Sequence, residues 1–153
     1  MQDIATGKST RTLERFLAVV AAAACLAGFI RAWQMTYAPI PGSAETSTNP
    51  APGLYMTEML ILSGAGVIST FANRVKARWA VAGAMLAFSV MGAWSIGLAF
   101  LPTAALFMLA AILATRRHRQ NLMTGIATWV SAGIAQMSVM LIIIRIVEPT
   151  AIF

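Results

Sequence analysis

The sequence predicts an all-α integral membrane protein, a small bundle of about five transmembrane helices. Two features of its composition carry this prediction: 59% of the 153 residues are hydrophobic and only 10% are charged. A soluble domain has about a quarter of its residues charged. The third observation is that uncharged runs close to the roughly 20 residues needed to cross a bilayer recur along the chain. This pattern excludes a soluble globular protein.

The first predicted span covers about residues 14–35. The uncharged run between Arg15 and Arg31 has only 15 residues, too few at 1.5 Å per residue for a hydrocarbon core of about 30 Å. The helix must therefore use its flanks, because Arg31 can extend to the headgroups and Trp33 suits the interface. A cleaved signal peptide ending near Cys25 is the alternative. Since apolar residues continue beyond Cys25, we expect a retained span.

Residues 37–53 are rich in Pro, Gly, Ser and Thr, which predicts an outer loop. The second span follows at about residues 54–72, and Glu58 is its one charged residue. A last span is predicted at about residues 122–146, where 23 uncharged residues precede Arg145.

The region between Arg78 and Arg116 has no charge for 37 residues, which would make one helix of about 55 Å, nearly twice the bilayer core. The chain must therefore turn back, and Gly97 and Pro102 place the turn near residues 97–102. Spans at about residues 79–97 and 100–116 result. A hairpin that dips into the membrane is the alternative, but we expect two crossings. The whole chain, residues 1–153, is then one membrane domain.

The distribution of basic residues predicts the orientation. Nine of the eleven Lys and Arg residues flank the spans on one side, which the positive-inside rule assigns to the cytoplasm. The N-terminus is thus expected in the cytoplasm and the C-terminus outside, in the cytoplasmic membrane of a bacterium. Topology explains the basic excess, so nucleic acid is not an expected partner. Six basic residues are expected to contact anionic lipid headgroups on the cytoplasmic side: Arg74, Lys76, Arg78, Arg116, Arg117 and Arg119.

Glu58 and Gln136 are the two candidate functional polar residues within the predicted spans. Glu58 lies one turn from Tyr55, close enough to the outer surface to be hydrated or to pair with Arg31 or Arg145. Gln136 lies near the middle of the last span and is expected to form hydrogen bonds between helices. Small and polar residues recur around it at every fourth position, which favours close helix packing; they are Thr124, Thr128 and Ala132 in one row, and Ala127, Ser131 and Ala135 in another.

The sequence offers little for catalysis or cofactors. Cys25 is the only cysteine and His118 the only histidine, and His118 has no acidic or cysteine co-ligand nearby. Residues 63–66 read Ser-Gly-Ala-Gly but lack the lysine and the preceding strand of a phosphate loop. No serine has a base beside it. We therefore expect no metal, no cofactor and no enzymatic activity.

The resulting expectation is a non-catalytic membrane protein, an accessory or structural subunit that packs against the helices of other membrane proteins. The alternative is a small oligomeric transporter or channel, which would need Glu58 and Gln136 to line a shared cavity.

Overall fold

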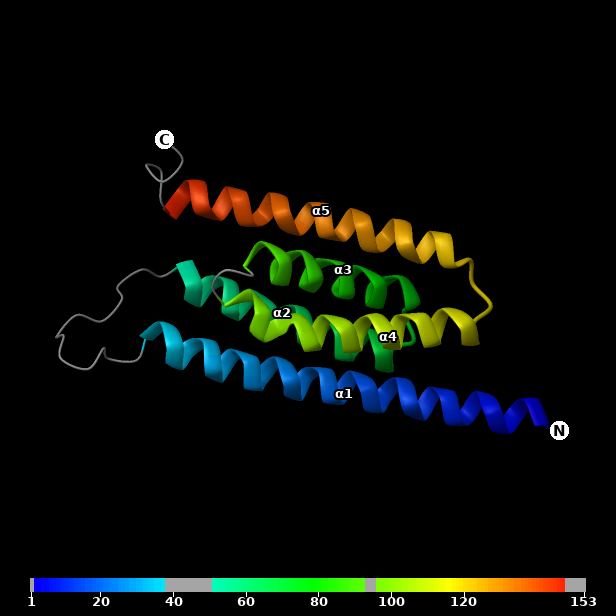
Figure 1. The fold of residues 1–153 in the computed structure, drawn as a ribbon. Coiled ribbons are helices and arrows are strands. Elements are labelled where there is room, and N and C mark those ends of the chain that lie inside the picture. Colours follow the sequence, from blue (N-terminus) through cyan, green and yellow to red (C-terminus); the bar gives the residue numbers. More distant parts are fainter. Residues whose placement is uncertain (1, 38–50, 93–95, 148–153) are drawn as a thin grey trace.

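The computed structural model describes residues 2–37, 51–92 and 96–147. Within these ranges the chain forms five α-helices and one short 3-10 helix, and successive α-helices run in opposite directions along a common axis (Figure 1). The elements are α1 (Gln2–Tyr37), α2 (Ala51–Phe71), α3 (Val75–Met91), η1 (Gly97–Phe100), α4 (Leu101–Arg117) and α5 (Leu122–Val147). The all-α prediction is confirmed.

Four segments are long and apolar enough to cross a membrane, namely Ser9–Tyr37, Pro52–Phe71, Gly97–Arg117 and Leu122–Ile146. They agree with four of the predicted spans to within about five residues. The helix α1 begins earlier than the predicted span, at Gln2 rather than near residue 14. Most of the predicted outer loop, residues 38–50, lies outside the described residues. The number of crossings and the treatment of the chain as one domain stay predictions.

The helix α3 ends six residues before the predicted end of the third span, at Met91 instead of residue 97. Gly92 caps it, and the N–H of Gly97 donates to the Gly92 carbonyl at 2.7 Å. A Cβ on Gly97 would lie 2.5 Å from the Gly92 carbonyl carbon, so only glycine fits here. The chain has therefore turned before α4, and Pro102 lies in the first turn of α4 as predicted.

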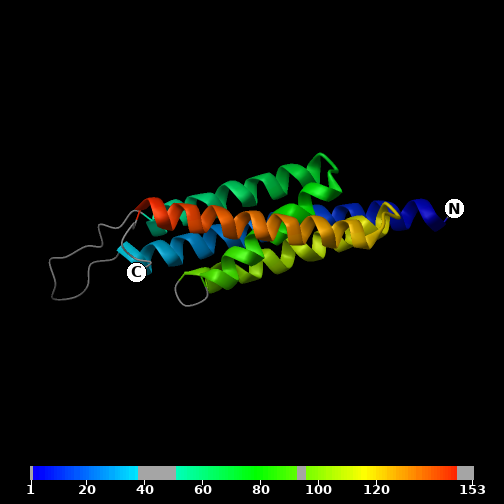
Figure 2. The same ribbon diagram turned by 90° about the horizontal axis from the view of Figure 1, so that it is seen from above.

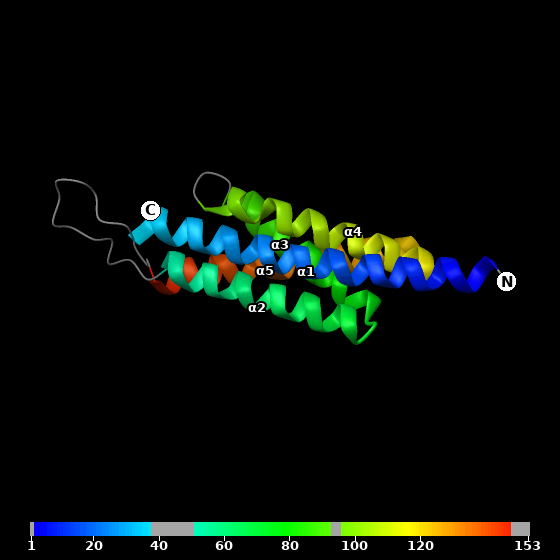
Figure 3. The ribbon, with the colours of Figure 1, turned by 90° about the horizontal axis from the view of Figure 1, so that it is seen from below.

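The helix α3 lies at the centre of the bundle. It packs against α2, α4 and α5, whereas α1 packs against α2 and α4. Views from above and below show α1 and α5 on opposite sides of the molecule (Figures 2 and 3). The largest buried apolar side chains fill the space between α1, α2, α3 and α4; they are Phe88, Phe100, Phe107, Met56, Met59 and Met85.

Glycines bring α3 and α5 into backbone contact. A Cβ on Gly83 of α3 would lie 2.1 Å from the carbonyl oxygen of Trp129. On α5, a Cβ on Gly125 would lie 2.5 Å from the indole ring of Trp79. Without a strong hydrophobic drive between helices in lipid, such close contact is a principal source of helix association. The position of α5 thus depends on small residues along this line.

Candidate functional site

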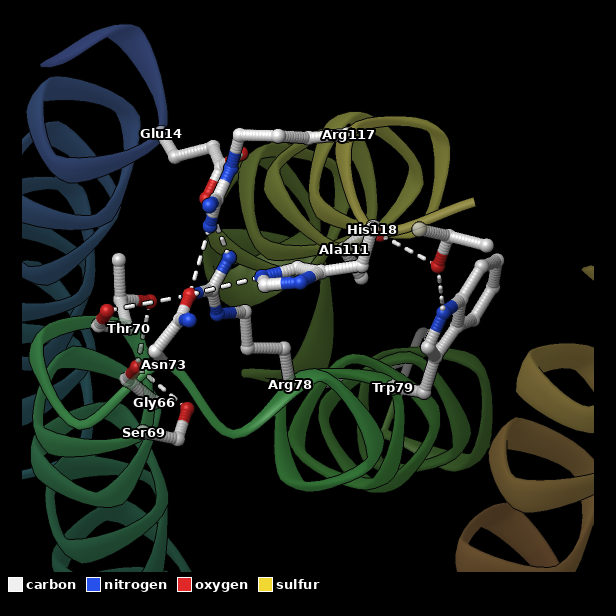
Figure 4. A network of polar contacts seen from close by, with 11 residues as sticks. Glu14, Gly66, Ser69, Thr70, Asn73, Arg78, Trp79, Ala111, Arg117 and His118 are labelled. Atoms are coloured by element: carbon white, nitrogen blue, oxygen red, sulfur yellow. Dashed lines mark hydrogen bonds and ion pairs between the residues drawn. The ribbon is translucent and has the colours of Figure 1, made fainter. Parts of the chain in front are cut away.

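A cluster of buried charges lies at the end of the bundle that holds the N-terminal part of α1 and the α2–α3 and α4–α5 turns (Figures 1 and 4). Glu14 of α1 is its centre, and the Glu14 side chain is only 1% exposed. Its Oε2 accepts a hydrogen bond from Arg78 Nη1 of α3 at 2.7 Å. Arg117, the last residue of α4, donates from Nε to Oε1 at 2.7 Å and from Nη2 to Oε2 at 3.1 Å. One carboxylate therefore joins three helices.

The turn after α2 supplies the next member of the cluster. The N–H of Arg74 donates to the Ser69 carbonyl at 2.8 Å, and that of Asn73 donates to the Thr70 carbonyl at 3.3 Å. These two bonds form a Schellman motif, in which Asn73 takes the left-handed conformation with φ 60°. Asparagine tolerates this conformation better than most residues. The motif directs Asn73 toward α4, where its Oδ1 accepts from Arg117 Nη2 at 2.6 Å.

The helix α4 ends in the same way. The N–H of Gln120 donates to the Thr115 carbonyl at 3.1 Å, and Arg119 has a φ of 50°. Arg117 faces the cluster, with its side chain 16% exposed, whereas Arg116 and Arg119 are exposed. The direction in which each residue points at the end of α4 thus places Arg117 inside the bundle and Arg116 and Arg119 on its surface.

Arg78 has a side chain that is 0% exposed and therefore needs further acceptors. Its Nη2 donates to the Thr70 carbonyl at 3.0 Å, in the last turn of α2, where the helix dipole favours a cation. Arg78 Nε is buried without a partner among the described residues. Two guanidinium groups share one carboxylate, and the carbonyl of Thr70 and the amide of Asn73 supply the additional acceptor oxygens.

His118 completes the cluster, which we call the Glu14 cluster and define as Glu14, Asn73, Arg78, Arg117 and His118. The Nε2 of His118 lies 3.0 Å from Asn73 Oδ1. Because that oxygen is an acceptor, Nε2 carries the proton. Partial burial, and next the charge of Arg117, hold the pKa of His118 below its ordinary value, although Glu14 acts in the opposite direction. The imidazole is therefore neutral at pH 7.

The cluster corrects part of the predicted headgroup site. Arg74, Lys76, Arg116 and Arg119 are exposed at this end of the bundle. Arg78 and Arg117, which were also expected at lipid headgroups, are instead directed into the bundle and bind Glu14. The physical reason is that a buried carboxylate provides two strong, charge-assisted acceptors that lipid would otherwise have to supply.

No hydrogen bond connects Glu58 to Gln136 in the described part of the chain. Both lie about one turn from the hydrogen bond that Tyr55 donates to the Met140 carbonyl at 3.0 Å, Glu58 on α2 and Gln136 on α5. Glu58 Oε2 and Gln136 Nε2 are each buried without a hydrogen-bond partner in the described part of the chain. Glu58 forms no ion pair within that part, so the expected pairing with Arg31 or Arg145 is not present.

Sequence reasoning missed Glu14, which reads as one more charge in a polar flank beside Arg15. A signal was nevertheless present in the helical spacing. Glu14 begins a row of positions three and four apart that is buried from residue 14 to residue 32 of α1; the others are Ala18, Ala21, Cys25, Gly28 and Ala32. A carboxylate on the small-residue face of a helix indicates a partner inside the bundle.

Fold and cluster together define a small helical bundle with four segments able to cross a membrane, tied at one end by buried ion pairs. The chain matches no protein-family model, no curated protein and no solved structure.

Proposed function

We propose that this chain is a non-catalytic, polytopic membrane protein that acts as an accessory or structural subunit by packing α5 against helices of a larger membrane assembly. One observation carries the proposal. The small-residue row Ala127, Ser131 and Ala135 is exposed; Ala127 and Ser131 are turned away from the side of α5 that contains the buried Gly125 and Gln136, and Ala135 flanks that side. We call this row the outer α5 face.

The two sides of α5 can be distinguished by their residues. The side that packs on α3 contains Gly125 and the buried Gln136. At about 100° per residue, Ala127 and Ser131 lie roughly 140–180° around α5 from Gln136 and Ala135 lies about 100° from it, and all three are exposed. Two of the predicted small-residue positions, Thr128 and Ala132, are half-buried beside α3. Some of the small residues predicted to pack against another helix thus lie on the side of α5 that contacts α3, and the others are exposed.

The chemistry of the outer α5 face suits another helix better than lipid. Thr128 and Ser138 donate their hydroxyls to carbonyls of their own helix at 2.8 and 3.0 Å. The hydroxyl of Ser131 has no such bond within the described residues, and a free hydroxyl is costly in hydrocarbon. Small side chains on either side of it let a second backbone approach closely. These features support a helix of another protein as the partner.

Association through the outer α5 face can be tested with Ala127→Leu, at the position of the row that lies opposite the buried Gln136. A leucine there would hold a partner helix away, so we expect association to weaken about fivefold, corresponding to about 1 kcal/mol. The measurement is the apparent mass of the complex extracted in mild detergent at native expression level, with identification of what comigrates. The matched control is Ala27→Leu, the same change at an exposed alanine of α1. Unchanged migration of Ala127→Leu, or equal effects of both variants, would contradict the proposal.

We further propose that the end of the bundle with the Glu14 cluster lies in the cytoplasm. The N-terminus of α1 and the α2–α3 and α4–α5 turns gather at this end (Figure 1). Exposed basic residues at both turns support the assignment, because cytoplasmic flanks are enriched in Lys and Arg; they are Arg74, Lys76, Arg116 and Arg119.

Cysteine labelling tests this orientation. In a Cys25→Ser background, a cysteine at Gln120 should react with an impermeant reagent only after lysis. Cysteines introduced at Ser47 or Thr150 should react in intact cells. The reason is that Gln120 follows α4 on the proposed cytoplasmic side, whereas the other two positions fall in the proposed outer segments. Labelling of Gln120 from outside intact cells would reverse the orientation.

A further inference from the structure

An apolar groove lies between α4 and α5 and has a volume of about 590 Å³. Met108 and Ile112 of α4 form one wall, Ile126 and Trp129 of α5 form the other, and Trp79 of α3 lies between them. We call it the α4–α5 groove. Although a short turn connects α4 to α5, the two helices have few contacts with each other, because both pack mainly on α3. The groove is therefore a consequence of how α3 separates its neighbours.

The base of the groove is held in place by specific contacts. The indole N–H of Trp79 donates to Thr115 Oγ1 at 2.8 Å, and Thr115 donates in turn to the Ala111 carbonyl at 2.9 Å. From α5, Gly125 lies against the Trp79 ring with no room for a Cβ. The positions of both walls relative to Trp79 are thus fixed before any ligand binds.

The groove continues along α4 toward the other end of the bundle. A second hollow shares Met108 and Ile112 with it and extends to Leu101. From Arg116 to Leu101 the path covers 15 residues of helix, or about 22 Å. One leaflet of the hydrocarbon core is about 15 Å deep. The path is long enough to hold an acyl chain through the full depth of a leaflet.

The end of the groove beside the α4–α5 turn is cationic. Arg116, Arg119 and Gln120 line it there, and its described lining contains no carboxylate. Arg119 has a φ of 50°, a left-handed conformation that glycine or asparagine adopts more easily. This left-handed cap position ends α4 and leaves Arg119 in the lining of the groove. Guanidinium groups are well suited to phosphate because they donate several hydrogen bonds in one plane.

We propose that the α4–α5 groove is a binding site for one anionic phospholipid of the leaflet on this side of the membrane. Its phosphate would bind Arg116 and Arg119, and one acyl chain would lie along Ile112, Ile126 and Trp129. The charge of the groove end, the apolar walls and the length of the path all match this one ligand. The inference does not rest on the outer α5 face, which lies on a different side of α5.

The test uses tryptophan quenching by phospholipids with brominated acyl chains. In a Trp33→Phe, Trp94→Phe background, Trp79 and Trp129 are the two remaining tryptophans, and both line the groove. The full chain is reconstituted in phosphatidylcholine that contains increasing amounts of brominated phosphatidylglycerol or brominated phosphatidylcholine. We expect half-maximal quenching by the anionic lipid at about tenfold lower mole fraction, because each basic residue adds to its attraction. Half-maximal quenching at equal mole fractions of the two lipids would overturn the proposal.

Two charge-removing pairs separate a site from the general attraction of a basic surface. Arg116→Gln with Arg119→Asn should abolish the preference for the anionic lipid, and asparagine keeps the left-handed turn accessible. The control pair, Arg74→Gln with Lys76→Gln, removes as much exposed charge at the same end but outside the groove, so the preference should remain. A similar loss in both pairs would mean surface attraction alone and would contradict a discrete site.

A last arm distinguishes an intact lipid from its headgroup. Unbrominated phosphatidylglycerol should relieve the quenching by competition, whereas glycerol phosphate, which has no acyl chain, should not. Relief by glycerol phosphate would show that the phosphate alone is bound and that the apolar groove contributes nothing. Quenching by neither brominated lipid would contradict the proposal as well.

Discussion

Replacement of Glu14 by glutamine is expected to lower the free energy of unfolding by about 3–5 kcal/mol, the cost of leaving buried charge without its partner. Arg78, whose side chain is fully buried, would keep the Thr70 carbonyl but lose the one ionic partner that it has among the described residues. Arg117 would lose its ionic partner and one of the two acceptor oxygens that it now binds, because an amide keeps a single carbonyl oxygen. The measurement is unfolding of the purified protein by denaturing detergent in mixed micelles, followed by circular dichroism.

The matched control is Glu58→Gln, the same chemical change at a half-buried carboxylate that forms no ion pair in the described structure. It should change stability little. Adding Arg78→Met to Glu14→Gln should recover part of the loss, because removing both members of a buried pair is much less costly than removing one. Equal stability of the wild type and Glu14→Gln would mean that the cluster does not hold the helices together.

The helices could be predicted from the sequence because the bilayer fixes how long an uncharged segment must be. The segment at residues 122–146 shows this most clearly, since its predicted bounds and those of α5 differ by one residue at most. The end of the third span was harder to predict from the sequence. Gly97 and Pro102 indicate a turn but not the residue at which α3 ends, which depends on the contact between Gly92 and Gly97.

The candidate site could be predicted only in part, because charge counting assigns an arginine to a side of the membrane and not to a face of a helix. Lys76 and Arg78 are two residues apart, yet the first is exposed and the second is buried. The difference is one of helical phase. Val75, Arg78, Trp79 and Ala82 follow the spacing of a buried helix face, which Lys76 does not share. The pairing with Glu14, 64 residues earlier, additionally depends on the tertiary arrangement of α1 and α3.

The contact between α3 and α5 was also beyond the sequence. The chain has 11 glycines, and small residues occur on every apolar segment. Small residues permit a close helix crossing wherever they occur, so their spacing alone does not say which pair of helices meets. In the structure Gly83 meets Trp129, whereas Gly64 of α2 is exposed with open space around it. This difference makes the contact testable.

Gly83→Ala is expected to lower the free energy of unfolding by about 1–3 kcal/mol, the usual cost of overpacking. The upper end of the range applies, because the added Cβ would lie 2.1 Å from the carbonyl oxygen of Trp129, and this obstacle is backbone rather than a flexible side chain. The steric clash can be relieved only if α5 moves away from α3. The same detergent unfolding measures the loss, and Trp129 fluorescence should change, since its environment depends on this crossing.

Gly64→Ala is the matched control, because a Cβ on Gly64 meets nothing within 4 Å. Alanine also has a higher helix propensity than glycine, so Gly64→Ala should be neutral or stabilising by up to about 1 kcal/mol. Both changes add one methyl group to a helical glycine, and they differ in whether a second helix occupies the space. Equal effects of the two variants would show that α3 and α5 do not cross at Gly83, whereas a loss confined to Gly83→Ala would locate the crossing there.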